Sequence, residues 1–390
     1  RLLQSGRPIE KQNAAQVLGD KAQDPEERLL LANLGVISLL VNFLREDCPV
    51  DRKTRRDPRA KAAVALANFS TAPLSKDSEL ASCQKEVAAA GAIPVLVELA
   101  RTSTSTGRQA AAKALACIVE KNPSLQQEAL TAGVVPVLLH MVRNGQETEE
   151  YSDGNASLAL SHLMDLGAAR QSLAAEESAV TSLVQVLKEC KSSNGAVFAS
   201  EVLASLAGLS AEMASAVVEA DGIRLMVRVL ESCFTGELGL QGTRALLAIL
   251  SLNEKYECMA SEAGIVSCCI RLLSMGRSSK EQEEGSTWSP TRMEMRKLLR
   301  CIARGSRGNA RKLSDVSSCL DDLANLARKR DEQGNFDWPG SYEAAVLLLN
   351  FAALSEANKI KVIRSLGKGF RDGGQPFFEL LLREVKEITS

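Results

Sequence analysis

Apolar residues recur at every third or fourth position along most of this sequence, which is the spacing of helices with one buried face. The segment RAKAAVALANFS at 59–70 shows this pattern clearly. Similar segments follow at 108–119, 153–164, 197–208, 240–251, 292–303 and 340–354. Alanine, leucine and valine supply most of the 45% of residues that are apolar, and only 4% of residues are aromatic. This composition favours helices over strands, so we predict an all-α protein.

A second phrase alternates with the first along the chain. AAAGAIPVLVELA at 88–100 recurs as LTAGVVPVLLHMV at 130–142. Further copies lie at 31–44, 219–230 and 261–273, with a weaker one at 176–187 and still weaker ones at 317–327 and 372–385. Aligned on the glycine or its substitute, the anchors are Gly35, Gly91, Gly133, Ser178, Gly222 and Gly264. Their spacings of 56, 42, 45, 44 and 42 residues indicate a unit in the range of helical solenoids.

Each unit is predicted to contain a short helix, a glycine corner, an apolar middle helix and a longer amphipathic helix. Glycine suits the corner because a Cβ atom would clash in so sharp a bend. Pro94 and Pro136 fall in the first turn of the middle helix, where a missing N–H costs nothing.

The phrases AGAIPVLVEL and AAVALANFS resemble the usual phrases of armadillo repeats. The resemblance covers nearly the whole chain, and it is strong at 86–142 and 210–273 and weak after residue 290. It implies a right-handed α-solenoid of about eight three-helix repeats. HEAT repeats are the neighbouring alternative, but they normally have two helices and lack the Gly-Ile-Pro corner.

We expect a single armadillo-repeat array over residues 1–390, in which 1–21 is the tail of a truncated repeat. The parent protein is therefore expected to extend N-terminally. The successive repeats are predicted at 22–70, 83–119, 125–164, 169–208, 211–251, 254–303, 309–354 and 355–390. Polar loop insertions are predicted at 45–59, 71–82, 276–291 and 331–341.

The sequence offers little for catalysis. His140 and His162 are its only histidines, which argues against a multi-histidine metal site and a histidine-based triad. The Gly-x-Ser-x-Gly, phosphate-loop and His-Glu-x-x-His motifs are absent. We therefore expect a non-catalytic protein without a cofactor or a metal ion.

The ten cysteines include no Cys-x-x-Cys pair, the spacing that zinc ribbons and redox motifs use. We expect them to be small buried apolar residues in a reducing compartment. The predicted location is the cytoplasm, and also the nucleus if the basic tract at 51–61 is a localisation signal. The most apolar stretch, 29–44, is shorter than the roughly 20 residues of a membrane span, so no membrane insertion is expected.

The armadillo resemblance implies that partners lie as extended peptides in a concave groove lined by the long helices. In well-studied members a Trp and, four residues later, an Asn recur on this helix, and the Asn side chains hold the peptide backbone. The Asn position here holds Asn68, Cys117, His162, Ser205, Ala248, Cys301 and Asn350. The Trp position holds Val64, Lys113, Leu158, Glu201, Arg244, Lys297 and Val346. Since Asn survives at two positions and Trp at none, a receptor for nuclear-localisation signals is not expected.

The predicted partner-binding residues of this groove carry charges of both signs. They are Asn68, Lys113, His162, Glu201, Ser205, Arg244, Lys297, Arg300 and Asn350. Arg296, Arg300 and Arg304 share one helical face and would suit an acidic or phosphorylated peptide through bidentate contacts. The same face would also suit nucleic-acid phosphate, and a solvated helix surface is the structural alternative.

Our first functional hypothesis is a protein-interaction scaffold or adaptor that binds an extended or helical partner segment in its groove. The second is the substrate-recognition part of a larger ubiquitin ligase, because plant ligases with a U-box ahead of armadillo repeats resemble this repeat style. The sequence contains no U-box residue to support it. The third is a nucleic-acid-binding helical repeat. A net charge of 47 − 48 = −1 and the scarcity of aromatic residues argue against it.

Overall fold

The computed structural model describes most of the chain as helices. The described residues are 1–48, 57–71, 77–144, 152–189, 193–232, 236–265, 268–269, 294, 297–298, 301, 317–328, 341–353, 356–367 and 377–383. They belong to two compact units, Arg1–Leu209 (unit 1) and Ser210–Ser390 (unit 2). Within the described ranges all regular secondary structure is helical, which confirms the all-α prediction.

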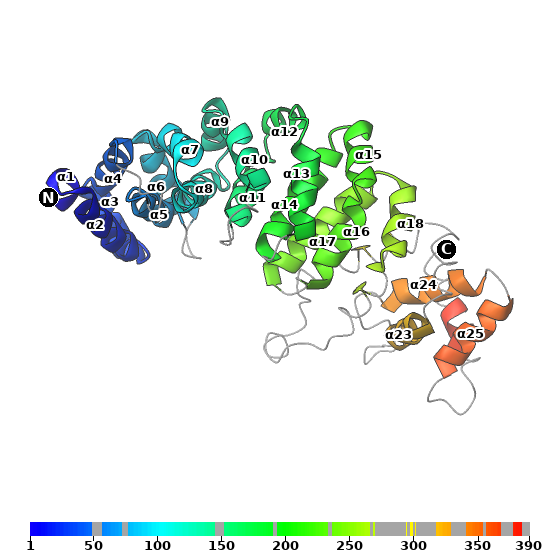
Figure 1. Cartoon of the computed structure of the whole chain (residues 1–390). Helices are drawn as coiled ribbons and strands as arrows, with labels where there is room; N and C mark the ends of the chain where they lie inside the picture. Colours follow the sequence, from blue (N-terminus) through cyan, green and yellow to red (C-terminus); the bar gives the residue numbers. More distant parts are fainter. Residues whose placement is uncertain are drawn as a thin grey trace. The chain divides into compact units, whose positions relative to one another are not determined.

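Unit 1 begins with α1 (Leu2–Ser5) and α2 (Pro8–Lys21), and four sets of a short, a middle and a long helix follow (Figure 1). The short helices are α3 (Pro25–Asn33), α6 (Asp77–Ala89), α9 (Pro123–Thr131) and α12 (Gly167–Ala174). The middle helices are α4 (Val36–Arg45), α7 (Ala92–Thr102), α10 (Val134–Asn144) and α13 (Ala179–Glu189). The long helices are α5 (Ala60–Phe69), α8 (Ser105–Val119), α11 (Ser152–Leu163) and α14 (Ser193–Ala207).

Unit 2 continues the same order of elements. Its first set is α15 (Ala211–Glu219), α16 (Gly222–Ser232) and α17 (Gly236–Leu250). The later described helices are α18 (Glu254–Glu262), α23 (Ser317–Ala327), α24 (Ser341–Ala352) and α25 (Glu356–Gly367), with residues 377–383 also helical. The predicted insertion at 276–291 lies outside the described residues, as does 331–340 of the last one.

Small residues allow the long helices of unit 1 to stack closely. Helix α8 packs against α5 on one side and α11 on the other, and α11 packs against α14. The buried residues of α8 are Ser105, Gly107, Ala110, Ala111, Ala112, Ala114, Leu115, Ala116, Ile118 and Val119. Alanine costs no side-chain entropy in a helix and fills little space, so neighbouring backbones approach each other on both sides. The low aromatic content of the sequence is thus a consequence of a core built from closely stacked helices.

The corners before the middle helices have the predicted left-handed conformation at four glycines. Their φ angles are 72° at Gly35, 78° at Gly91, 75° at Gly133 and 93° at Gly264. This region favours glycine because a Cβ atom clashes there with the following carbonyl oxygen. The glycine alignment therefore identified a real backbone requirement in these repeats.

The anchor assigned to Gly222 was wrong by one residue. The left-handed residue of that corner is Asp221, with a φ of 66°, and Gly222 is the first residue of α16. Aspartate tolerates this region better than most side chains because its short polar group can bond locally. Gly222 has a different role, since a Cβ atom there would lie 2.6 Å from the carbonyl oxygen of Val217. Ser178 is not among the left-handed residues of the described chain.

The predicted insertion at 71–82 was also partly wrong, because residues 77–82 belong to helix α6. The segment is polar, as loops usually are. Its residues nevertheless include glutamate, leucine and alanine, which are good helix formers. The repeat predicted to begin at residue 83 therefore begins inside a helix.

No single helix in the described ranges is both long enough and apolar enough to cross a membrane. One bent pair, Pro25–Asn33 with Val36–Arg45, meets the criteria of length and composition together, with a bend of 72°.

Candidate peptide-binding strip

The predicted groove residues of unit 1 occupy equivalent places on four stacked long helices. We call these eight residues the binding strip, and they are Val64, Asn68, Lys113, Cys117, Leu158, His162, Glu201 and Ser205. Lys113 is exposed, and the other seven side chains are half-buried. Each pair is separated by four residues and therefore lies on one helical face. The structure thus brings the five predicted residues of unit 1 into one row.

Two Asn positions of the strip, Asn68 and His162, are linked to the long helix before them. The Asn68 amide donates to the carbonyl oxygen of Gly19 on α2, at 2.9 Å. His162 Nδ1 lies 2.9 Å from the carbonyl oxygen of Ala116 on α8. A carbonyl oxygen only accepts hydrogen bonds, so Nδ1 of His162 is the donor in this contact. Gly19 and Ala116 occupy the same place in their repeats, and these two strip residues therefore make one recurring structural bond.

The short helices contribute polar residues that the sequence interpretation missed. Arg28, Gln84 and Gln126 each lie seven residues before a corner glycine. Gln84 Nε2 donates to the carbonyl oxygen of Cys117 at 2.9 Å, and Gln126 Nε2 donates to that of His162 at 2.8 Å. Arg28 Nη1 donates to the carbonyl oxygen of Thr71, just beyond α5, at 2.6 Å. These side chains satisfy carbonyls that a helix end leaves without an internal partner.

The spacing of seven residues before the corner was visible in the sequence and could have identified them. Glu257 holds the same place before Gly264 in unit 2, and Cys301 Sγ lies 3.1 Å from its Oε1 atom. Because Cys301 is at the Asn position of its helix, the link between short helix and Asn position occurs in both units. These short-helix residues therefore hold in place the ends of the long helices that carry the Asn positions.

The predicted cationic residues of unit 2 share one carboxylate. Lys297 Nζ lies 2.8 Å and Arg244 Nε 3.8 Å from the same Glu294 oxygen. The Glu294 side chain is only 13% exposed, whereas Arg244 and Lys297 are 57% and 59% exposed. Both cations, predicted as partner-binding residues, therefore lie beside one carboxylate while more than half of each side chain stays exposed. Arg300 lies outside the described residues, and Asn350 is an exposed residue of α24.

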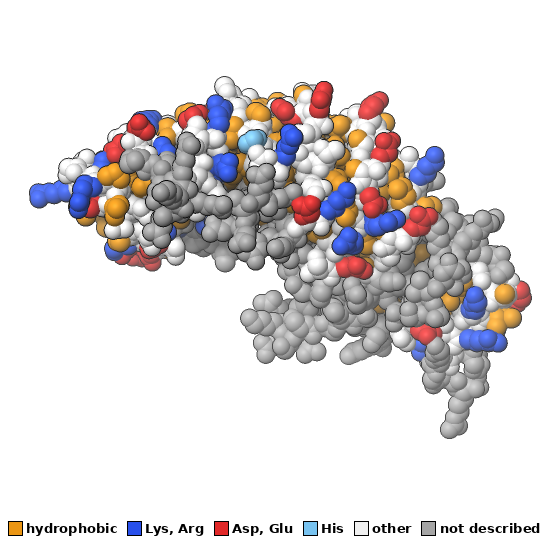
Figure 2. Space-filling view, in the orientation of Figure 1, with side chains coloured by type: hydrophobic (Ala, Val, Ile, Leu, Met, Phe, Trp, Pro, Cys, Tyr) orange, Lys and Arg blue, Asp and Glu red, His pale blue; other side chains and the backbone are white. Residues whose placement is uncertain are grey.

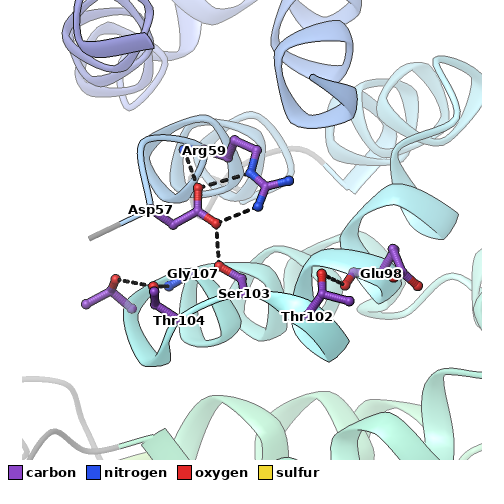
Figure 3. Close-up of polar contacts among 8 residues, drawn as sticks. Asp57, Arg59, Glu98, Thr102, Ser103, Thr104 and Gly107 are labelled. Carbon is purple, nitrogen blue, oxygen red and sulfur yellow. Dashed lines mark hydrogen bonds and ion pairs between the residues drawn. The ribbon is translucent and has the colours of Figure 1, made fainter. Parts of the chain in front are cut away.

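A buried ionic cluster joins the turn before α5 to Ser103, which lies between α7 and α8 (Figure 3). Asp57 accepts from the backbone N, Nε and Nη2 of Arg59 at 2.9, 3.0 and 2.8 Å. Its second oxygen also accepts from the Ser103 hydroxyl. The Asp57 side chain is fully buried and that of Arg59 is 16% exposed. The predicted insertion at 45–59 therefore ends in an anchored turn.

This cluster makes unit 1 sensitive to acid. Burial would raise the pKa of Asp57, but the hydrogen bonds from Arg59 and Ser103 outweigh it and hold the pKa below its ordinary value. A carboxyl whose pKa is lowered on folding stabilises the fold above its unfolded pKa of about 4, and this stability is lost as pH falls through the folded pKa. Urea unfolding followed by circular dichroism from pH 7 to pH 3 should therefore show a shallower decline in Asp57→Asn than in wild type. Equal declines would contradict the assignment.

The cysteines of the described ranges carry free thiols. Cys48, Cys83, Cys268 and Cys269 are buried, and Cys117, Cys258 and Cys301 are half-buried. Burial raises the pKa of the Cys117 thiol. It therefore stays protonated at neutral pH and is a weak nucleophile. Among the described residues no three His, Cys, Asp or Glu side chains gather in a group that could hold a metal ion.

Solved structures resemble the chain in fold. An engineered protein aligns with 99% of this chain and 97% of its own at 23% identity and a TM-score of 0.50. A designed armadillo repeat protein in complex with the peptide (KR)4 aligns with 63% of this chain and 96% of its own, at 23% identity and a TM-score of 0.50. The chain has an armadillo-like repeat fold. No protein-family model and no curated protein matches the sequence.

The armadillo-like fold explains why the strip is continuous within unit 1. Repeated short, middle and long helices place one face of every long helix on the same side of the stack. Figure 2 shows one face of the molecule, on which the basic and acidic side chains of the described residues are intermingled. Electrostatic recognition on such a surface depends on individual charged side chains rather than on a broad potential of one sign.

Proposed function

We propose that the protein is a non-catalytic scaffold whose binding strip holds an extended peptide segment of a partner protein. The observation that carries this proposal is the row of equivalent, half-exposed positions on successive long helices of unit 1. The armadillo-like fold supports it, since a designed armadillo repeat protein of similar fold binds a peptide. The link from Asn68 to Gly19 adds rigidity to the strip, because it ties one long helix to the next.

Within the binding strip, the exposed charge of Lys113 favours an acidic or phosphorylated residue of the peptide at that position. Lys113 is the strip's exposed cation, and Val64 and Leu158 lie on the long helices to either side. Packed helices are about 8–10 Å apart, and an extended chain advances about 3.3 Å per residue, so about three peptide residues separate neighbouring positions. The matching segment has apolar residues three positions before and three positions after an acidic residue. The Lys-Arg peptide of the designed protein would meet repulsion at Lys113.

The test is binding of two synthetic peptides, Leu-x-x-Glu-x-x-Leu and Leu-x-x-Lys-x-x-Leu, measured by fluorescence anisotropy. The wild-type chain should bind the Glu peptide about tenfold more tightly, because one charge-assisted contact contributes about 1.4 kcal/mol. Lys113→Glu should reverse the preference. Lys188→Glu is the matched control, since it changes the same charge at an exposed residue of a middle helix and should leave both affinities unchanged. If neither peptide binds, or if both variants behave alike, the strip is not the site.

A further inference from the structure

One ring nitrogen of His162 is left open toward the binding strip. The Nδ1 atom of His162 donates to the carbonyl oxygen of Ala116 at 2.9 Å, which ties α11 to α8. Gln126 holds the backbone of the same residue, because its Nε2 donates to the His162 carbonyl oxygen at 2.8 Å. Nε2 of His162 has no hydrogen-bond partner among the described residues, and it is not one of the side-chain atoms that are buried without a partner. The half-buried ring is therefore fixed at Nδ1, and its Nε2 is accessible to a bound peptide.

Asn68 is arranged in the same way at the equivalent place of α5. Its Nδ2 donates to the carbonyl oxygen of Gly19 at 2.9 Å. Its Oδ1 has no hydrogen-bond partner in the part of the chain that the structure describes, and it is not one of the atoms buried without a partner. An amide oxygen only accepts hydrogen bonds, and a neutral imidazole whose proton is on Nδ1 also accepts at Nε2. Both residues therefore use their donor inside the fold and present an acceptor to the strip.

His162 differs from Asn68 because its acceptor can be converted into a donor. Protonation of an imidazole places a hydrogen on both ring nitrogens, and it ordinarily occurs between pH 5 and 8, where carboxylate, ammonium and guanidinium groups keep their charge. The chain contains one other histidine, His140, which is exposed on the middle helix α10 with its Nε2 3.0 Å from Asn144 Nδ2. The titratable side chains on the helices that pack against α11 are Arg108, Lys113 and Cys117 of α8, His140 and Arg143 of α10, and Glu201 of α14.

We propose that Nε2 of His162 selects a serine or threonine hydroxyl in the peptide that the strip holds, and that protonation of the ring removes this selection. The inference rests on the proposed peptide-binding function. A neutral ring rejects carboxylate and phosphate groups at this position, because they are acceptors as well. An ammonium group is disfavoured, because the exposed cation Lys113 lies on the adjacent helix α8. A hydroxyl group is an uncharged donor and satisfies both conditions.

The probe is the peptide Ala-Leu-Ala-Ala-Glu-Ala-Ala-Leu-Ala, acetylated and amidated at its ends, which contains the segment that matches the strip. Each alanine is replaced in turn by serine and by O-methylserine, which can accept a hydrogen bond but cannot donate one. Fluorescence anisotropy at pH 8 should show one position at which serine binds about fivefold more tightly than O-methylserine, the effect of one hydrogen bond. At pH 5.5 the two peptides should bind alike, because a protonated ring donates to either oxygen.

Two variants at His162 separate the acceptor from the imidazole ring. His162→Asn should keep the serine preference at both pH values, because an asparagine can make the bond to Ala116 in the way that Asn68 bonds on α5 and still present its oxygen. His162→Phe should remove the preference at both pH values, and His162→Asn still tests the inference if the phenylalanine variant does not fold. His140→Asn is the matched control, since it removes the other imidazole from an exposed position of α10 and should leave the preference and its pH dependence as in wild type.

Equal binding of serine and O-methylserine at pH 8, at every position of the peptide, would overturn the inference and leave the peptide-binding function intact. A serine preference that persists at pH 5.5 in wild type, or that survives in His162→Phe, would also overturn it, because another acceptor would then be responsible. Loss of the pH dependence in His140→Asn would have the same consequence. Absence of binding by all of the peptides would overturn the proposed function and this inference with it.

Discussion

Replacing Asp57 with asparagine is expected to destabilise unit 1 by about 3 kcal/mol, the size typical of removing one partner of a buried ion pair. Asparagine has nearly the same shape, so the packing stays and only the charge and two acceptor sites change. If the amide nitrogen takes the place of Oδ2, Arg59 Nη2 and the Ser103 hydroxyl both lose their acceptor. If it takes the place of Oδ1, the backbone N–H and Nε of Arg59 lose theirs instead. Either orientation leaves a buried donor without a partner.

The measurement has to separate the two units. Hydrogen exchange of the α5 and α8 amides reports on unit 1, and these amides should exchange faster in Asp57→Asn. Exchange of the α16 and α17 amides reports on unit 2 and should stay unchanged.

Asp47→Asn is the control for the Asp57 prediction. Asp47 is an exposed carboxylate that follows α4 in the same loop, so its replacement removes the same charge from a solvated place. Such surface changes usually stay within about 0.5 kcal/mol. If both variants lose the same stability, loss of net charge explains the result and the buried cluster does not.

The repeat array could be predicted because helices and repeats both produce local patterns in a sequence. The three-and-four spacing around Leu66 and Leu115 reflects one buried face, and both residues are in the core. The glycine corners were predictable for the same reason, because a left-handed backbone conformation limits which residue types can occupy the position. At one corner the left-handed residue is Asp221 and not a glycine. The alignment on glycine therefore selected the neighbouring Gly222. Local rules therefore predicted the order of the elements, with errors at the Gly222 anchor and at the start of α6.

The candidate site was harder to predict because its properties depend on partners distant in sequence. Lys297 was assigned as a ligand-binding cation from its position, but Glu294 lies beside it and also pairs with Arg244 of another helix. His162 was predicted as a groove residue from its position, and its Nδ1 contact with the Ala116 carbonyl oxygen crosses 46 residues of sequence. The pairing of Asp57 with Ser103 crosses 46 residues as well. Residue type and spacing place a side chain on a face, whereas contacts between repeats decide what remains available there.

A second large effect is expected at Gly19, where Gly19→Val should destabilise unit 1 by about 3 kcal/mol. Gly19 lies near the end of α2 at its contact with α5, and an added Cβ atom would lie 2.9 Å from both the Cα and Cβ atoms of Ala65. A backbone atom cannot rotate away, so the two long helices have to separate. Their separation also lengthens the hydrogen bond from Asn68 to the Gly19 carbonyl, now 2.9 Å. Asn68 belongs to the binding strip, and peptide affinity should fall along with stability.

Gly242→Ala tests whether the loss arises from this contact or from any change of a helical glycine. Gly242 lies within α17, and an added Cβ atom there would meet only Leu230 Cδ1, at an ordinary 3.7 Å. Alanine favours a helix over glycine by about 1 kcal/mol, so this substitution should leave unit 2 equally stable or slightly more stable. Gly19→Ala gains the same propensity but still meets the Ala65 backbone, so its net effect on the free energy of unfolding should have the opposite sign. Opposite signs for these two alanine substitutions would show that the close approach of α2 and α5 at Gly19 causes the loss of stability there. A stabilising effect at both positions, measured by hydrogen exchange within each unit, would contradict that conclusion.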